Sequence, residues 1–178
     1  MISKEKLVSD KVILDPFKSS NVTEKYLSWM KDKNINQYIL KSHDNLILKD
    51  LKTFVDDLDK SKNDIFFRII DKKQQLHIGN IRLGPINFEN QYTKFGILIG
   101  EKNFQKKGYA RESIRLVIDY SFNNLKLKIF KFECVSENVP AMKLYQNMGF
   151  KMEKIPEKFI KNNKALDQVM WYRENKFL

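Results

Sequence analysis

The chain has 178 residues, of which 42% are hydrophobic and 12% aromatic, so it is long enough to bury a sizeable core. No apolar run approaches the length of a membrane span, and the first ten residues lack the apolar stretch of a signal peptide. A single cysteine excludes an internal disulfide, and with only two histidines beside it a zinc or iron–sulfur site is not expected. We therefore expect a cytoplasmic protein with no metal and no membrane partner.

The net charge of +11 could attract nucleic acid or another polyanion. Five of the 33 basic residues are arginines, and the other 28 are lysines scattered along the whole chain. Nucleic-acid sites more often cluster their charge and use arginine for bidentate contacts. We therefore favour a lysine-rich solvated surface, which would also suit a small polyanionic ligand, and do not expect nucleic acid as a partner.

No linker, repeat or low-complexity tract divides the sequence, so we expect one domain over residues 1–178. The spacing of apolar residues predicts an α/β layout of strand, two helices, three strands, helix, strand, helix and two strands. The strands are expected at residues 8–14, 65–70, 76–83, 92–100, 129–135, 150–155 and 166–172.

Local signals place the ends of several elements. Ser20 or Asn21 is expected to cap the first helix, and the pair Gly84 and Pro85 is expected to mark a break after the third strand. Asn138 and Pro140 open the last helix, where proline has no intrahelical N–H to lose.

One segment has the features of a phosphate-binding loop. It leads from a strand into a helix whose first turn presents unpaired N–H groups and a partial positive charge. Gly108 lets the backbone approach a ligand closely, and small Ala110 does so nearly as well. Lys106 and Lys107 add positive charge, but the nucleotide P-loop pattern is missing. Taken alone, this spacing also occurs for structural reasons.

Two further residues stand out in the second half of the chain. Glu133 alternates with Phe132 and Cys134 in an apolar strand, so its side chain points away from theirs. A carboxylate there needs solvent or a partner, which places it at a cleft or at an edge. Tyr145 lies on the apolar side of the next helix, where a packed core tyrosine is the commoner arrangement.

Together these motifs resemble those of the GNAT superfamily of N-acetyltransferases, and most closely its ribosomal-protein N-terminal acetyltransferase-like branch. The likeness covers nearly the whole chain in element order. Its first motif is Phe104, Gln105, Gly108 and Ala110 after a strand; its second is Asn138, Ala141, Tyr145, Gly149 and Phe150. The branch is suggested by residues 78–81, 98–100 and 108–114.

The resemblance implies a GNAT fold, an α/β (mixed α+β) arrangement. Its mostly antiparallel mixed sheet would have about seven strands, flanked by about four helices and splayed at the cofactor strand. It also implies acetyl-CoA as co-substrate. The pyrophosphate would lie on the loop and first helical turn, the pantetheine arm along the splayed strand, and Asn138 would bond that arm. The implied cofactor-binding residues are Ile97, Leu98, Ile99, Gln105, Lys106, Lys107, Gly108, Tyr109, Ala110, Arg111 and Asn138.

The implied catalytic residues are Glu133 and Tyr145, which are twelve positions apart as in members acting on ribosomal-protein N-termini. An amine reacts only when neutral, and α-amines have pKa values near ~8, so a carboxylate that takes the proton would assist attack on the thioester. Tyr145 would act as general acid at the sulfur. Lys94 departs from the pattern, because relatives often carry an acidic residue beside this strand. Cys134, opposite Glu133, is a poor acyl carrier, so direct transfer is expected; His43 and His77 are interpreted as structural.

The acceptor stays open between a protein N-terminus and an amino sugar or other small amine. We expect acceptor specificity to come from residues 29–44 and 156–164, the parts least like the motifs. Two alternatives remain: a non-catalytic CoA-binding module and, less favoured, a basic nucleic-acid-binding protein. A homodimer is also left open.

Overall fold

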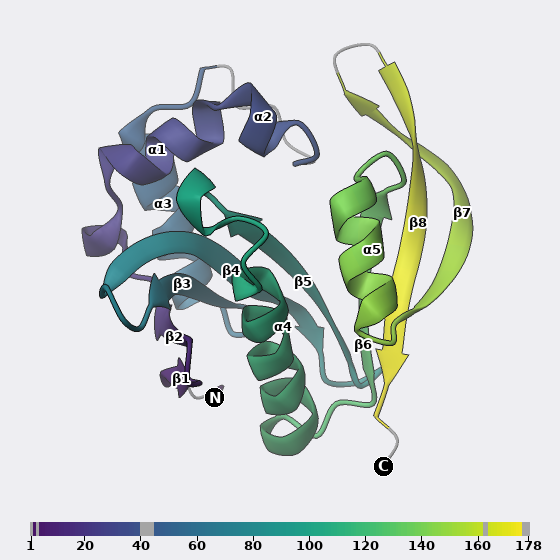
Figure 1. Cartoon of the computed structure of the whole chain (residues 1–178). Helices are drawn as coiled ribbons and strands as arrows, with labels where there is room; N and C mark the ends of the chain where they lie inside the picture. Colours follow the sequence, from purple (N-terminus) through teal and green to yellow (C-terminus); the bar gives the residue numbers. More distant parts are fainter. Residues whose placement is uncertain (1, 3, 40–44, 162–163, 176–178) are drawn as a thin grey trace.

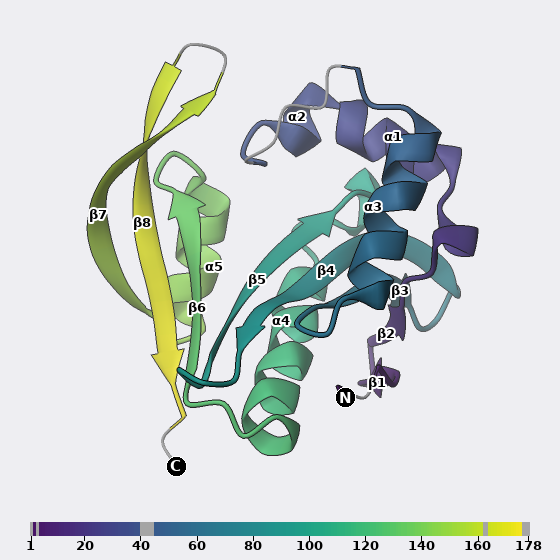
Figure 2. The same cartoon turned by 180° about the vertical axis from the view of Figure 1, so that it is seen from behind.

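The computed structural model describes residues 2, 4–39, 45–161 and 164–175. These residues build one sheet of eight strands with helices on both faces (Figures 1 and 2). The strands are β1 (Leu7–Val8), β2 (Val12–Pro16), β3 (Ile65–Asp71), β4 (Leu76–Asn87), β5 (Tyr92–Ile99), β6 (Ile129–Val135), β7 (Lys151–Lys161) and β8 (Lys164–Glu174). The α-helices are α1 (Glu24–Lys31), α2 (Lys33–Asn36), α3 (Leu48–Lys60), α4 (Tyr109–Asp119) and α5 (Val139–Asn147). Two 3₁₀ turns, η1 (Ser19–Asn21) and η2 (Lys102–Phe104), and a π-helical turn, η3 (Tyr120–Asn124), complete the elements.

The sheet order is β1-β2-β3-β4-β5-β6-β8-β7. Every neighbouring pair is antiparallel except β5 and β6, which run parallel at the centre. Helices α4 and α5 cover one face of the sheet and α3 covers the other, with α1 and α2 across one end (Figures 1 and 2). This confirms the predicted mixed, mostly antiparallel sheet and GNAT fold, with one strand and one helix more than the approximate numbers expected.

Several predicted boundaries were wrong. Residues 8–14 do not form one strand, because the Ser9 hydroxyl accepts hydrogen bonds from the backbone N–H groups of Lys11 and Val12 and turns the chain into the β1–β2 hairpin. Gly84 and Pro85 do not end β4; the register with β5 shifts there and the strand continues. Thr23, rather than Ser20 or Asn21, caps α1 by accepting from the Tyr26 N–H at 3.4 Å. Strands β7 and β8 are longer than expected.

Two apolar clusters lie on the two faces of the sheet. The first packs β2 to β6 and β8 against α4 and α5, and it contains Phe95, Phe130, Phe132 and Tyr145. The second packs α1 and α3 on the opposite face, where Leu51, Val55 and Leu58 of α3 are buried. Phe54 of the same helix remains 36% exposed. The sheet is therefore covered on both faces in its N-terminal half.

No helix within the described ranges is long and apolar enough to cross a membrane.

Candidate active site

The central feature of the site is the separation of two adjacent strands. Strands β5 and β6 pair only at Tyr92 with Ile129 and at Thr93 with Phe130. Beyond that point β5 continues beside β4, whereas β6 continues beside β8, so the two halves of the sheet form a V (Figure 1). From Lys94 to Ile99 the edge of β5 that faces β6 has no strand partner among the residues described. Its backbone groups are therefore available to a ligand in the V.

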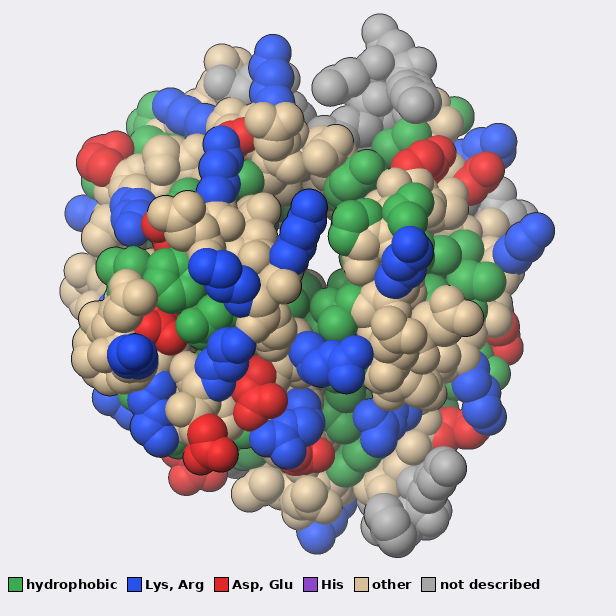
Figure 3. Space-filling view, viewed as in Figure 1, with side chains coloured by type: hydrophobic (Ala, Val, Ile, Leu, Met, Phe, Trp, Pro, Cys, Tyr) green, Lys and Arg blue, Asp and Glu red, His purple; other side chains and the backbone are tan. Residues whose placement is uncertain are grey.

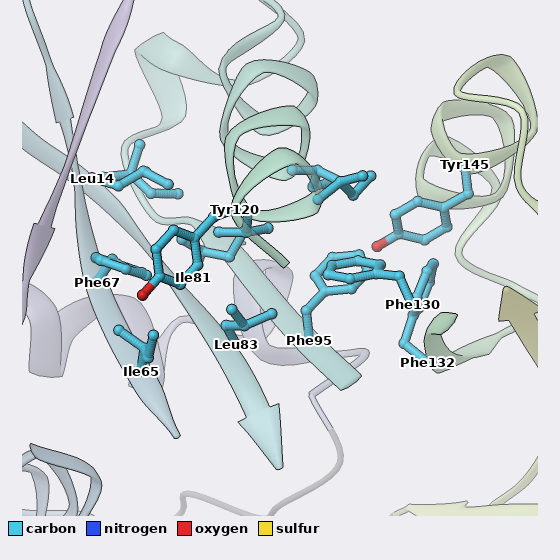
Figure 4. Packing of buried hydrophobic residues seen from close by; sticks show 14 of the residues in the cluster. Leu14, Ile65, Phe67, Ile81, Leu83, Phe95, Tyr120, Phe130, Phe132 and Tyr145 are labelled. Carbon is cyan, nitrogen blue, oxygen red and sulfur yellow. The ribbon is translucent and has the colours of Figure 1, made fainter. Parts of the chain in front are cut away.

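Aromatic rings fill the apex of the V on the face covered by α4 and α5. The Phe95 ring lies 4.2 Å from the Phe132 ring and 4.9 Å from the Phe130 ring, measured between centroids. The Tyr145 ring from α5 lies 4.4 Å from that of Phe132, and the labelled rings converge at this point (Figure 4). The apex is therefore a rigid apolar floor beneath the unpaired edge of β5.

The predicted phosphate loop lies between η2 and α4, at the end of β5. Gly108 is the N-cap of α4, with φ +85°, and no side chain caps the helix there. The N–H groups at the start of α4 therefore have no side-chain acceptor from the cap residue, as an anion site requires. Lys106 also has a positive φ, +58°, and the side chains of Lys106 and Lys107 are exposed. The loop thus has the open, basic helix start that its sequence predicted.

Three contacts hold the loop in place. The Gln105 side-chain amide donates to the Ile99 carbonyl at 2.9 Å, which ties the loop to the end of β5. The Tyr109 hydroxyl donates to the Asp71 carboxylate at 2.8 Å, so this side chain anchors the first residue of α4 to the end of β3. The Lys11 ammonium donates to the Lys107 carbonyl and lies 4.4 Å from the centre of the Tyr109 ring. Sequence reasoning missed Lys11, because nothing in its local pattern relates it to a loop so far along the chain.

The remaining predicted cofactor residues surround the V. Ile97 and Ile99 pack against the first apolar cluster, and Leu98, between them, packs against the second. Arg111 is exposed in the first turn of α4. Asn138 caps α5 on the other arm, since its side-chain oxygen accepts from the Ala141 N–H at 3.3 Å. Its side-chain NH₂ has no partner within the described part of the chain and remains a donor.

The space-filling view shows an opening between the two halves of the molecule on the face of α4 and α5 (Figure 3). Hydrophobic side chains line part of its edge, and Lys and Arg side chains stand beside it (Figure 3). This arrangement suits a ligand with an apolar or neutral arm and a polyanionic end.

Glu133 lies on the face of β6 opposite to Phe132 and Cys134, as the alternation predicted, and so away from the face that α4 and α5 cover. Its carboxylate oxygen Oε1 is 2.5 Å from the Lys94 ammonium, and this ion pair joins β6 to β5 just beyond their last paired residues. The side chains of Glu133 and Lys94 are 26% and 33% exposed. The Glu133 carboxylate therefore already has a cation as its partner, which the sequence did not show.

Tyr145 is 7% exposed, and burial raises the pKa of its hydroxyl well above the ordinary value. The hydroxyl points from α5 toward the side of Phe95 and β5 (Figure 4). Among the residues described, none forms a hydrogen bond with it. A protonated donor therefore faces the V with its hydrogen bond unused, which differs from a fully satisfied core tyrosine.

The open end of the V is bordered by the segment that follows α2. The Tyr38 hydroxyl donates to the Glu137 carbonyl at 3.2 Å and so connects this segment to the turn between β6 and α5. Helix α1 is fixed beside it, because the Trp29 indole donates to Glu101 at 3.0 Å and its ring packs where a side chain at Gly100 would clash. Residues 40–44 and 162–163 of the segments expected to set acceptor specificity lie outside the described residues.

Cys134 and His77 are partly buried. Burial raises the pKa of the Cys134 thiol to about 11, so it is protonated at neutral pH. His77 packs at 5.1 Å from the Trp29 ring, and desolvation lowers its pKa. His43 lies outside the described residues. No group of three His, Cys, Asp or Glu side chains suited to a metal occurs in the described portion of the chain.

Comparison with known proteins identifies the domain. The sequence model of the acetyltransferase (GNAT) domain matches residues 11–151. An N-acetyltransferase 9-like protein of Dictyostelium discoideum is 27% identical over 165 residues, covering 82% of this chain and 76% of that protein. The spermidine N(1)-acetyltransferase of Vibrio cholerae is 32% identical over 112 residues, covering 62% of this chain and 64% of that relative.

Solved structures share the fold. Spermidine N-acetyltransferase from Vibrio cholerae, in complex with CoA and spermine, superimposes with a TM-score of 0.83 at 24% identity, over 93% of this chain and 96% of that one. A ribosomal-protein-serine acetyltransferase candidate from Vibrio cholerae superimposes with a TM-score of 0.78 at 16% identity, over 98% of this chain and 100% of that one. At these identities the likeness concerns the fold alone.

Proposed function

The chain belongs to the GNAT family of acetyltransferases, and we propose that it transfers the acetyl group of acetyl-CoA directly to a primary amine. The observation that carries this proposal is the separation of β5 and β6 beside the uncapped start of α4. An unpaired strand edge, an uncapped helix start and a tyrosine hydroxyl without a hydrogen-bond partner among the described residues surround one opening.

The donor would lie on the α4 and α5 side of the sheet. The backbone amides of residues 105–110 would hold the pyrophosphate, with Lys106, Lys107 and Arg111 supplying charge. The unpaired edge of β5 at Ile97, Leu98 and Ile99 would bind the pantetheine arm as a strand would, and the Asn138 NH₂ would donate to it from the other arm. A backbone N–H of β5 would polarise the thioester carbonyl.

The acceptor would approach from the opposite face, where Glu133 lies. Primary amines are mostly protonated at neutral pH, since their pKa values run from about 8 for α-amines to about 10.4 for lysine. Glu133, directly or through water, would take the proton that leaves the ammonium, a type of assistance typically worth roughly 10²–10⁴-fold. The neutral nitrogen then forms the amide bond as the carbon–sulfur bond breaks.

Tyr145 would act at the leaving sulfur. A thiolate with a pKa near ~8.5 is a moderate leaving group, so a hydrogen-bond donor helps without being indispensable. Because burial raises the pKa of Tyr145, its hydroxyl keeps its proton at neutral pH and stays a donor. Cys134 takes no part, because it is a protonated thiol within the first apolar cluster.

The acceptor class remains a protein N-terminus or an amino sugar or other small amine. The spacing of Glu133 and Tyr145 and the likeness to the ribosomal-protein N-terminal acetyltransferase-like branch support the first. The relatives act on chemically different amines, since one is a spermidine acetyltransferase and another an α/β-tubulin N-acetyltransferase. The family alone therefore does not select the acceptor.

The proposal is tested by measuring thiol release from acetyl-CoA with a panel of amines. We expect release that depends on the amine, and a pH–rate profile whose acidic limb changes in Glu133→Gln. Glu137→Gln, at the exposed turn after β6, is the matched control and should leave the profile as it is. An unchanged profile in Glu133→Gln would assign the base to another group; no amine-dependent release at all would refute the transfer itself.

A further inference from the structure

The acceptor face of the V carries an unusual balance of charge. Glu133 is the only acidic residue in β4, β5 and β6, whereas Arg82, Lys94 and Lys131 lie on the same three strands. Arg82 of β4 pairs with Gly96 of β5, and Gly96 lies two residues along β5 from Lys94. Because side chains alternate along a strand, Arg82 and Lys94 lie on the same face of the sheet. On these three strands a single carboxylate therefore accompanies three cations.

Two of these cations have partners other than Glu133. The Arg82 guanidinium is 2.6 Å from the Asp64 carboxylate, and the Lys131 ammonium lies 3.8 Å from the centre of the Tyr92 ring. Lys94 differs, because its partner is Glu133, the proposed base. The ammonium and the carboxylate that face an incoming amine thus form one half-exposed pair across the split between the strands.

We propose that Lys94 determines acceptor specificity: the Lys94–Glu133 pair binds an amine that carries a carboxylate or phosphate close to its ammonium. The anion of such an acceptor would form an ion pair with the Lys94 ammonium, and its ammonium would form an ion pair with the Glu133 carboxylate. The exchange replaces one ion pair by two, so neither protein charge is left unpaired at the half-buried split.

The exchange also prepares the proton transfer. In the free protein Glu133 faces Lys94; once the acceptor's anion occupies Lys94, the carboxylate faces the ammonium whose proton it must take. One proton passes to Glu133, and the nitrogen–carbon bond forms as the carbon–sulfur bond breaks. The nitrogen then loses its second proton and the sulfur takes one up, so the net products are the amide, CoA thiol and one proton.

This inference rests on the proposed acetyl transfer and narrows its acceptor. The test compares matched acceptors that differ only in the anion: L-methionine with L-methioninamide, and glucosamine 6-phosphate with glucosamine, with spermidine as the polycation. We expect kcat/KM for the anionic member of at least one pair to exceed that of its neutral-group partner by about 10- to 100-fold, as for a charge-assisted hydrogen bond. Spermidine should be a poorer acceptor than the anionic compounds. Whichever of the two pairs shows the difference in kcat/KM identifies the preferred anion as a carboxylate or a phosphate.

Variants of Lys94 test whether this residue causes the preference for anionic acceptors. Lys94→Met should reduce the anionic preference to within about threefold, and Lys94→Arg should retain it. Lys131→Met, which removes the neighbouring cation on the same face, should leave the preference unchanged. Binding of acetyl-CoA, followed by thermal shift, should be the same in all three variants.

The outcomes separate the two proposals. If acetyl-CoA binds but the anionic acceptors react no better than their neutral partners, or if Lys94→Met keeps the preference, the role of Lys94 is refuted and acetyl transfer stands. A higher kcat/KM for spermidine or for a peptide N-terminus than for every anionic acceptor would also refute the role of Lys94. If acetyl-CoA neither stabilises the protein nor is consumed, the proposed function itself fails.

Discussion

The Lys11 ammonium donates to the carbonyl oxygen of Lys107, a residue 96 positions further along the chain. This contact joins the β1–β2 hairpin to the loop that precedes α4. Because the same ammonium lies over the Tyr109 ring, Lys11 holds both the loop and the first residue of the helix. The proposed pyrophosphate site therefore depends on a side chain close to the N-terminus.

Lys11→Met should weaken acetyl-CoA binding about three- to tenfold, since an exposed charge-assisted hydrogen bond contributes on the order of 1 kcal/mol. Calorimetric titration measures the change. Lys72→Met is the matched control: its ammonium donates to the Ser9 carbonyl at 3.0 Å in the same hairpin without reaching the loop. Equal affinities of Lys11→Met and wild type would show that the contact does not support the site.

Gly108→Ala should lower the free energy of unfolding by about 1–2 kcal/mol, because φ +85° places a β-carbon in the unfavourable left-handed region. Urea denaturation measures this. Gly96→Ala serves as the comparison, since a β-carbon there meets nothing within 4 Å and alanine suits a strand better than glycine. If Gly108→Ala is as stable as Gly96→Ala, the loop does not require its left-handed residue.

Tyr145→Phe should reduce turnover roughly 10- to 100-fold, as for the loss of one hydrogen bond to a charged sulfur, while changing the acetyl-CoA dissociation constant less than about twofold. The reason is that only the hydroxyl, which has no partner in the described structure, is lost, and the packed ring remains. Tyr26→Phe removes the hydroxyl of another buried tyrosine, in the second cluster, and should leave turnover unchanged. Full activity in Tyr145→Phe would remove this residue from the chemistry.

Cys134 should behave as an inert thiol. With a pKa of about 11, its thiolate fraction rises about tenfold per pH unit below that value, so alkylation by iodoacetamide should accelerate steadily from pH 7 to pH 10. Mass spectrometry follows the reaction at this only cysteine. Cys134→Ala should retain turnover; loss of activity, or an acetylated thiol trapped without acceptor, would indicate an acyl intermediate instead of direct transfer.

The parts of the site that depend on local sequence were predictable. The bounds of β6, the Asn138 cap of α5 and the uncapped start of α4 follow from alternation, capping chemistry and a glycine at the helix start. Contacts between distant strands were not. The pairing of Lys94 with Glu133 depends on where β5 and β6 stop being neighbours, and only the complete sheet order sets that position. The break predicted at Gly84 and Pro85 was wrong for a related reason, because an irregular pairing between β4 and β5 accommodates these residues within the strand.

The most direct test of the account is the thermal unfolding of the protein over a series of acetyl-CoA concentrations. A ligand that binds the native state stabilises it by about 2.7 kcal/mol at a hundred times its dissociation constant. We predict a midpoint that rises with the logarithm of the acetyl-CoA concentration, and a smaller rise in Lys11→Met. An unchanged midpoint at millimolar acetyl-CoA would contradict the assignment of the opening between β5 and β6 as the acetyl-donor site.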